Sequence, residues 1–226
     1  MNRFYMVLLA PLVLASSAFA TPAPCVAALM RVYDVPGFSC TINALTFGGF
    51  VYGGTALGSG VAIPDASVRV TPIPTMADEG FTFQAPWSVS SVGGPGREDS
   101  LITYTAMGSG IIDLEVGFND ILSGTGTASV TERYCLGEAA ALPCTSGGTP
   151  GTIAVTDPPA GFSNFAFFNP QSLIGVSKDI LLNSGTNGMA IISEVSNNFS
   201  SPEPLSFVLL GSGLLGLGLL RKRIKR

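Results

Sequence analysis

Hydrophobic and polar residues alternate along short stretches in the middle of the chain. Val68 and Val70 alternate with polar neighbours, and the same pattern recurs around Leu114 and Val116. Alternation with a period of two gives a β-strand one buried face and one solvent face. Helical periodicity is scarce between residues 21 and 201. We therefore predict that this region folds as strands.

Ten runs of strand-like composition are separated by clusters of Gly, Pro, Asn, Asp and Ser. Such runs at this spacing favour an all-β fold, an antiparallel β-sandwich or jelly roll, over residues 21–195. Residues 196–201 are expected to form a flexible tether. The ten predicted strands are 41–52, 66–72, 80–84, 100–106, 111–118, 125–135, 151–156, 162–168, 177–183 and 188–199.

The first twenty residues have the three parts of a secretory signal peptide. Arg3 precedes an apolar run over 6–14, and small residues follow. Ala18 and Ala20 fit the A-x-A site that signal peptidase reads, and the apolar run is short for a transmembrane helix. We predict that residues 1–20 are removed by signal peptidase and that the protein is exported.

A second apolar segment lies close to the carboxyl end. Residues 205–220 carry no charge, and five of the six residues in 221–226 are Arg or Lys. A helix over 205–220 would be about 24 Å long, and flanking basic side chains could reach the lipid headgroups. The basic tail would stay in the cytoplasm by the positive-inside rule. A single transmembrane helix that serves as a simple permanent anchor is one interpretation.

Pro202, Glu203 and Pro204, followed by the Gly- and Leu-rich run and the basic end, resemble the PEP-CTERM sorting signal of exported bacterial proteins. The resemblance covers about the last 26 residues, 201–226. It implies that exosortase recognises the three motif residues and processes the chain nearby. It also implies a Gram-negative host, transient residence in the inner membrane, and delivery to the cell envelope, outer surface or extracellular matrix.

Four cysteines lie within the exported region, where an oxidising compartment favours disulfides. Four cysteines allow three pairings, and we favour the two that join cysteines close in sequence, Cys25–Cys40 and Cys135–Cys144. A zinc site is disfavoured, because the chain has no C-x-x-C pair and no histidine. We expect neither a metal nor another cofactor.

The charge distribution excludes one class of partner. The chain carries a formal net charge of −4, and residues 21–201 contain five basic against fourteen acidic side chains. Nucleic-acid binding needs clustered Lys and Arg, so no nucleic acid is expected as a partner. The absence of histidine also excludes Ser-His-Asp and Cys-His catalysis.

Paired carboxylates leave two chemical alternatives open. A glycosidase needs two carboxylates roughly 5 to 9.5 Å apart. Asp113 with Glu115, or Glu98 with Asp99, are candidates, and i, i+2 spacing on a strand would put Asp113 and Glu115 on one face. A solvent-exposed strand face is the simpler interpretation of Asp113 and Glu115.

Calcium is the second alternative. The acidic pair at 78–79 and the pair at 98–99 flank Gly-containing turns that could offer oxygen ligands. The chain has no Asp-x-Asp-x-Asp loop. We therefore do not favour a calcium site.

Aromatic side chains could contact sugars. Trp87 is the only tryptophan, and Tyr52, Tyr104 and Tyr134 are further candidates for stacking on sugar rings. A lone tryptophan after a strand is more often a core residue.

We therefore predict a non-enzymatic exported protein of the cell envelope or extracellular matrix. A carbohydrate-binding module that holds exopolysaccharide is the alternative, and a glycan-cleaving enzyme is a third.

Overall fold

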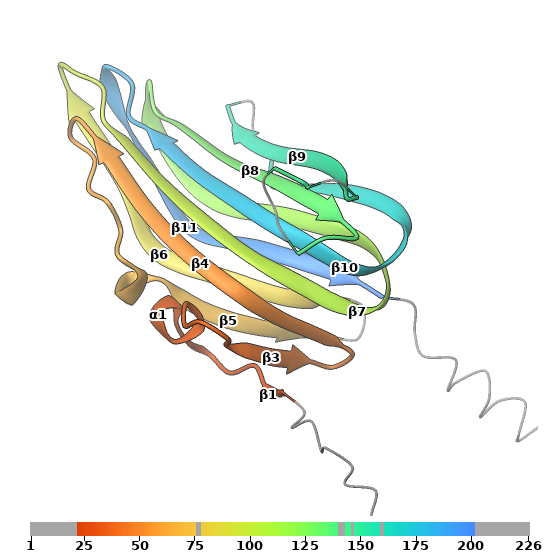
Figure 1. The fold of residues 1–226 in the computed structure, drawn as a ribbon. Helices are drawn as coiled ribbons and strands as arrows, with labels where there is room; N and C mark the ends of the chain where they lie inside the picture. The colour runs from red at the N-terminus through yellow and green to blue at the C-terminus, as the bar shows by residue number, and fades with distance from the viewer. Residues whose placement is uncertain (1–21, 76–77, 140–142, 146, 159–160, 202–226) are drawn as a thin grey trace, which may run out of the picture.

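The structure is a computed structural model, and it describes residues 22–75, 78–139, 143–145, 147–158 and 161–201. Nearly all of this part is β-strand, as the sequence predicts, with one short α-helix and one 3₁₀ turn (Figure 1). The elements are β1 (Ala23–Pro24), β2 (Ala28–Leu29), α1 (Met30–Tyr33), β3 (Ser39–Ile42), β4 (Leu45–Leu57), η1 (Asp65–Ser67), β5 (Arg69–Pro74), β6 (Glu79–Val92), β7 (Arg97–Gly124), β8 (Thr127–Leu136), β9 (Thr149–Asp157), β10 (Ser163–Asn183) and β11 (Asn187–Ser200).

Each predicted run overlaps an observed strand, with three differences in how the runs are joined, whereas the two-residue strands β1 and β2 are not predicted. The run 41–52 contains a turn, where Asn43 adopts a positive φ of 46°, and so supplies both β3 and β4. The runs at 100–106 and 111–118 are one strand, β7, because the backbone passes through Gly110 at a φ of 83° without leaving the sheet. In the same way, β10 joins two predicted runs across an irregular register near Gln171.

Strand β7 is long enough to take part in both halves of a curled sheet. Its residues 97–107 pair with β4 on one side and β10 on the other. Its residues 113–124 pair with β11, which continues to β6, β5 and β2. The sheet therefore curls along β7, and its two halves come to face each other (Figure 1). This arrangement is consistent with a β-sandwich. Among the described strand pairs, only β1 with β3 is parallel.

Aromatic side chains from both halves fill the space between them. Phe50 of β4 stacks on Tyr104 of β7 with ring centroids 5.1 Å apart. Phe47 of β4 meets Phe81 of β6 edge to face at 4.8 Å, and Phe199 of β11 lies 5.8 Å from Phe47. All five are buried. Because β4 and β6 belong to opposite halves, these contacts form the core that holds the curled sheet closed.

The expected tether at 196–201 is wrong for most of its length. Strand β11 continues to Ser200, paired with β7 along this stretch and with β6 as far as Phe199. Asn197 and Phe199 are fully buried, so the period-two pattern of β11 runs to its end. Residues that look like a polar linker in sequence therefore form a central strand.

Several predictions fall outside the described residues. The signal peptide with Ala18 and Ala20, the motif Pro202-Glu203-Pro204 and everything after it lie there. Among the described residues, no helix has both the length and the apolar character needed to span a bilayer.

Candidate functional site

Trp87 does not lie on the surface, so it is the core residue that the sequence favours, and the possible sugar contact at this position is wrong. Its side chain is fully buried, and its indole Nε1 donates a hydrogen bond to Ser100 Oγ at 3.1 Å. On β6, Trp87 is buried while the residues on either side of it are exposed, so its side chain points into the core.

The tyrosines are poor candidates for the same reason. Tyr104 is buried in the core, and Tyr52 and Tyr134 are half-buried. The Tyr52 hydroxyl lies 2.9 Å from the carbonyl oxygen of Ile63 and 2.8 Å from Ser100 Oγ, so it is already engaged within the fold.

Among the described residues, the exposed aromatic side chains are three phenylalanines around the start of β10, and Phe162, which is 71% exposed, directly precedes that strand. Phe165 is 49% and Phe167 is 76% exposed, while Ala166 between them is buried. Their rings lie nearly parallel, with an interplanar angle of 9° and centroids 6.2 Å apart. Sequence reasoning places these residues in a strand but does not identify them as a site. Their i, i+2 spacing was the available signal, since it puts both rings on one face.

The strand register places polar side chains beside these rings. Phe165 lies opposite Glu115 of β7, and Glu115 lies opposite Asn198 of β11. Phe167 lies opposite Asp113 in the next row. Residues directly opposite each other in an antiparallel pair project from the same face. We call these five residues the aromatic surface.

Asp113 and Glu115 do share one outer face, as their spacing predicts, and each is tied to β11. Asp113 Oδ1 accepts a hydrogen bond from the backbone N–H of Ser200 at 2.9 Å. Glu115 Oε2 accepts one from Asn198 Nδ2 at 3.2 Å. These bonds hold both half-buried carboxylates in place beside the rings. The aromatic surface thus combines apolar planes with fixed hydrogen-bonding groups.

The other acidic pairs do not converge. Glu98 is fully buried, whereas Asp99 forms an ion pair with Arg97 at 2.6 Å. Glu79 is buried while its neighbour Asp78 is exposed. Adjacent residues of a strand point to opposite faces, so neither pair can chelate one ion through both carboxylates. Within the described residues, no group of three or more His, Cys, Asp or Glu side chains is arranged to hold a metal.

Both predicted disulfides are confirmed. Cys25 bonds Cys40, with Cα atoms 4.9 Å apart, and this link ties β1 to β3. Cys135 bonds Cys144, with Cα atoms 5.6 Å apart, and closes a loop after β8. Paired cysteines are typical of proteins in an oxidising, exported environment.

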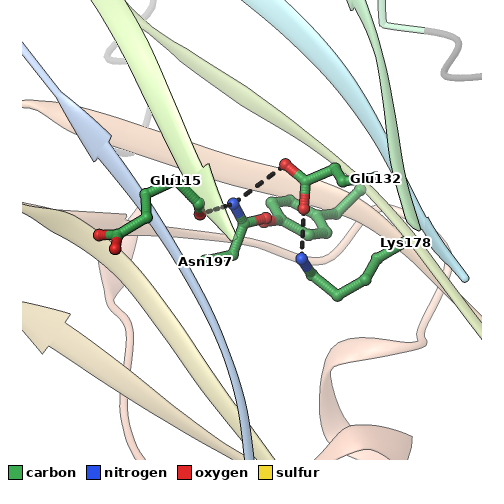
Figure 2. A network of polar contacts seen from close by, with 5 residues as sticks. Glu115, Glu132, Lys178 and Asn197 are labelled. Carbon is green, nitrogen blue, oxygen red and sulfur yellow. Dashed lines mark hydrogen bonds and ion pairs between the residues drawn. The ribbon is translucent and has the colours of Figure 1, made fainter. Parts of the chain in front are cut away.

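A second polar group lies inside the core, between the halves of the sheet (Figure 2). Lys178 of β10 forms an ion pair and hydrogen bond with Glu132 Oε2 of β8. Asn197 Nδ2 donates to Glu132 Oε1 at 3.1 Å and to the backbone oxygen of Glu115 at 2.8 Å. The Tyr104 hydroxyl donates to Asn197 Oδ1. We call Tyr104, Glu132, Lys178 and Asn197 the buried cluster.

Burial dominates the ionisation of the buried cluster. Lys178, Glu132 and Asn197 have no exposed surface, and Tyr104 is 1% exposed. Loss of hydration lowers the pKa of Lys178, and its attraction to Glu132 opposes this only in part. Loss of hydration likewise raises the pKa of Glu132, against the opposing effect of Lys178. Burial, and then the nearby Glu132, raise the pKa of Tyr104, so its hydroxyl stays protonated.

Comparison with known proteins gives no family. No family model matches the chain, and no curated protein matches it. One similar solved structure is TmCBM61, a carbohydrate-binding module in complex with β-1,4-galactotriose. It is 9% identical, with 66% of this chain and 86% of that chain covered, at a TM-score of 0.27. Another is the enzymatically active domain of tailspike protein 4 of bacteriophage CBA120. It is 17% identical, with 64% of this chain but only 19% of that chain covered, at a TM-score of 0.22. Likenesses this distant assign neither a family nor an activity to this chain.

Proposed function

We propose that this chain is a non-enzymatic exported protein of the cell envelope or extracellular matrix that binds polysaccharide across the aromatic surface. One observation carries the proposal: two exposed, nearly parallel phenyl rings, at Phe165 and Phe167, share a sheet face with fixed polar side chains.

The chemistry of this surface matches that of a sugar. A pyranose ring has an apolar C–H face and a rim of hydroxyl groups. Phe165 and Phe167 supply flat apolar area for the C–H face. Asp113 and Glu115 can accept hydrogen bonds from hydroxyl groups, and the Asn198 amide holds Glu115 in place. Exposed aromatic side chains set among polar groups are typical of binding surfaces.

The outer face of an open sheet suits a long, linear ligand. Successive residues of one strand that face the same way are about 6.6 Å apart. The two phenyl rings can therefore contact neighbouring parts of a chain of sugars. This geometry favours a polymer over a single small molecule.

Export rests on separate support. The two disulfides favour an oxidising compartment. The resemblance of the carboxyl end to a PEP-CTERM signal supports processing by exosortase at Pro202-Glu203-Pro204, after transient insertion of residues 205–220 into the inner membrane. Signal peptidase would act earlier, after Ala20.

The binding proposal is tested by affinity electrophoresis through gels containing a neutral galactan, a neutral glucan or an acidic alginate. The wild-type protein should be retarded by at least one polymer, and a Phe165→Ala/Phe167→Ala double variant should lose most of that retardation. Leu57→Ala is the matched control, because Leu57 is also exposed, at 68%, but lies at the end of β4. Free migration of the wild type in all three gels, or equal retardation of the double variant, would contradict the proposal.

The sorting proposal has its own measurement. Intact-mass analysis of protein recovered from the native envelope or matrix should give an amino terminus at Thr21 and a carboxyl terminus near Pro204. Recovery from the cytosol with Met1 and Arg226 both present would contradict it.

A further inference from the structure

Lys178 is the only lysine between residues 21 and 201, and it is fully buried. Lysine is almost never fully buried unless it is paired. The residues around it in β10, 174–182, are mostly apolar. In the pairing of β10 with β8, Lys178 lies directly opposite Glu132. A lysine that is fully buried cannot contribute to solubility, so its position in the core points to another role.

The carboxylate of Glu132 brings an amine and an amide together. One of its oxygens contacts the Lys178 amino group and the other contacts the Asn197 side-chain nitrogen, as Figure 2 shows. The carbonyl oxygen of the same amide accepts the hydrogen bond from the Tyr104 hydroxyl. The buried cluster thus holds a nucleophile, an electrophilic carbonyl carbon, a group that can carry protons and a donor for a developing oxyanion.

We propose that Lys178 and Asn197 join through an intramolecular isopeptide bond, formed within the folded chain with Glu132 as the proton carrier. A proton passes from the Lys178 ammonium to Glu132, and the neutral Nζ attacks Cγ of Asn197. The tetrahedral oxyanion is stabilised by the Tyr104 hydroxyl. The protonated Glu132 gives its proton to Nδ2 and then takes one from the attacking nitrogen, the Cγ–Nδ2 bond breaks, and ammonia leaves. The step is an exchange of one amide for another and needs no oxidant or added reactant.

The environment favours each part of this step. The lowered pKa of Lys178 and the raised pKa of Glu132 both favour the neutral amine and the protonated acid. The exclusion of water from the buried cluster protects the product from hydrolysis. The product also replaces a desolvated ion pair, which is costly to bury, with a neutral amide.

The bond would connect the two halves of the curled sheet. Lys178 lies in the part of β10 that pairs with β8 and with the first part of β7. Asn197 lies in β11, between β6 and the second part of β7. A covalent link at this point would hold the halves together when other contacts are pulled apart or attacked by proteases, which suits a protein outside the cell.

The sequence makes the bond easy to detect. After reduction and alkylation, cleavage after glutamate cuts at Glu138 and Glu194, so Lys178 and Asn197 fall on separate peptides, 139–194 and the peptide that runs from 195 to the carboxyl end of the recovered chain. We expect one branched peptide whose mass is the sum of these two minus one ammonia. Fragmentation should place the link at Lys178 and Asn197.

Three variants assign the roles. Glu132→Gln keeps the size of the side chain but cannot carry the protons, so the two peptides should separate. Asn197→Ala lacks the carbonyl and should give the same result. Asn197→Asp should restore the branched peptide, because the same bond then forms with loss of water. Rescue by Asp but not by Ala would not be expected of a residue that only fills space.

Separate, unmodified peptides from the folded wild-type protein would overturn the proposal. The same holds for a Lys178 amine that reacts fully with an amine-selective reagent once the wild-type protein is denatured. Both results are independent of polysaccharide binding, since the aromatic surface lies on the outer face of the sheet.

Discussion

Ser100 Oγ lies 2.8 Å from Glu98 Oε1, and both side chains are fully buried. The Tyr52 hydroxyl lies 2.8 Å from the same Ser100 oxygen and 2.9 Å from the carbonyl oxygen of Ile63. Ser100 Oγ donates the hydrogen bond to Glu98 Oε1, while Glu98 Oε2 is buried without a hydrogen-bond partner among the described residues. A charged Glu98 is therefore poorly compensated for its lost hydration.

The burial of Glu98 predicts how stability depends on pH. Burial, followed by the neighbouring Asp99, raises the pKa of Glu98 to about 7, although the Ser100 hydrogen bond opposes the shift. A carboxyl whose folded pKa is raised stabilises the fold fully below its unfolded pKa of about 4.3, and this contribution is lost as the pH rises through about 7. Glu98→Gln keeps an acceptor for the Ser100 hydroxyl and stays neutral at every pH. The variant should therefore be more stable than the wild type at pH 8, by on the order of 3 kcal/mol.

Urea unfolding of both proteins at pH 4.5, 6 and 8 checks this prediction. The difference between the two should grow with pH and level off above about 7. The comparison isolates Glu98 from other buried acids, which are common to both proteins. If the difference in stability between Glu98→Gln and the wild type were the same at all three pH values, the raised pKa of Glu98 would be contradicted.

The disulfide between Cys25 and Cys40 should stabilise the sheet edge. It closes a loop of 15 residues and holds the two-residue strand β1 against β3. A Cys25→Ser/Cys40→Ser double variant should lose about 3 kcal/mol, mainly because its unfolded chain is less constrained. Thermal unfolding followed by circular dichroism measures the loss. A melting temperature equal to that of the wild type would show that β1 is held by its other contacts.

Period-two patterning predicts the strands of this protein well, because most of them have one buried face. It does not predict where a strand bends without ending, as β7 does at Gly110. It also cannot say which face is inward in an aromatic-rich run: Phe165 and Phe167 point outward, while Phe81 and Phe83 point inward. That choice depends on the curl of the whole sheet, and the same curl brings Lys178 and Asn197 together from different halves.

Gly80 is a position where the packing of strands should forbid any side chain. A Cβ atom there would lie 1.9 Å from the backbone oxygen of Asn197 on β11. Gly80→Ala should therefore push β6 from β11 and destabilise the fold by roughly 3 kcal/mol or more, as overpacking in cores does. Gly53→Ala is the matched control, because Gly53 lies in β4 and its Cβ would meet nothing within 4 Å.

Urea unfolding of the two glycine variants gives the comparison. The control should match the wild type or exceed it slightly, since alanine restricts the unfolded chain. Equal stability of Gly80→Ala and Gly53→Ala would mean that β6 and β11 can separate without cost.

The carboxylates of the aromatic surface should hold polysaccharide without cleaving it. Asp113→Asn and Glu115→Gln each replace a charged acceptor with a neutral amide of the same size, so each should weaken retardation by polymer a few-fold, in line with about 1 kcal/mol per hydrogen bond. Size-exclusion chromatography of the retarding polymer after long incubation with the wild-type protein should show no change in length. Shortening of the polymer by the wild type, abolished in either variant, would instead identify Asp113 and Glu115 as the acid and base of a glycosidase. Binding that is unchanged in both variants would leave the phenyl rings as the main contacts, and the two carboxylates would then serve to hold β7 and β11 in register through Ser200 and Asn198.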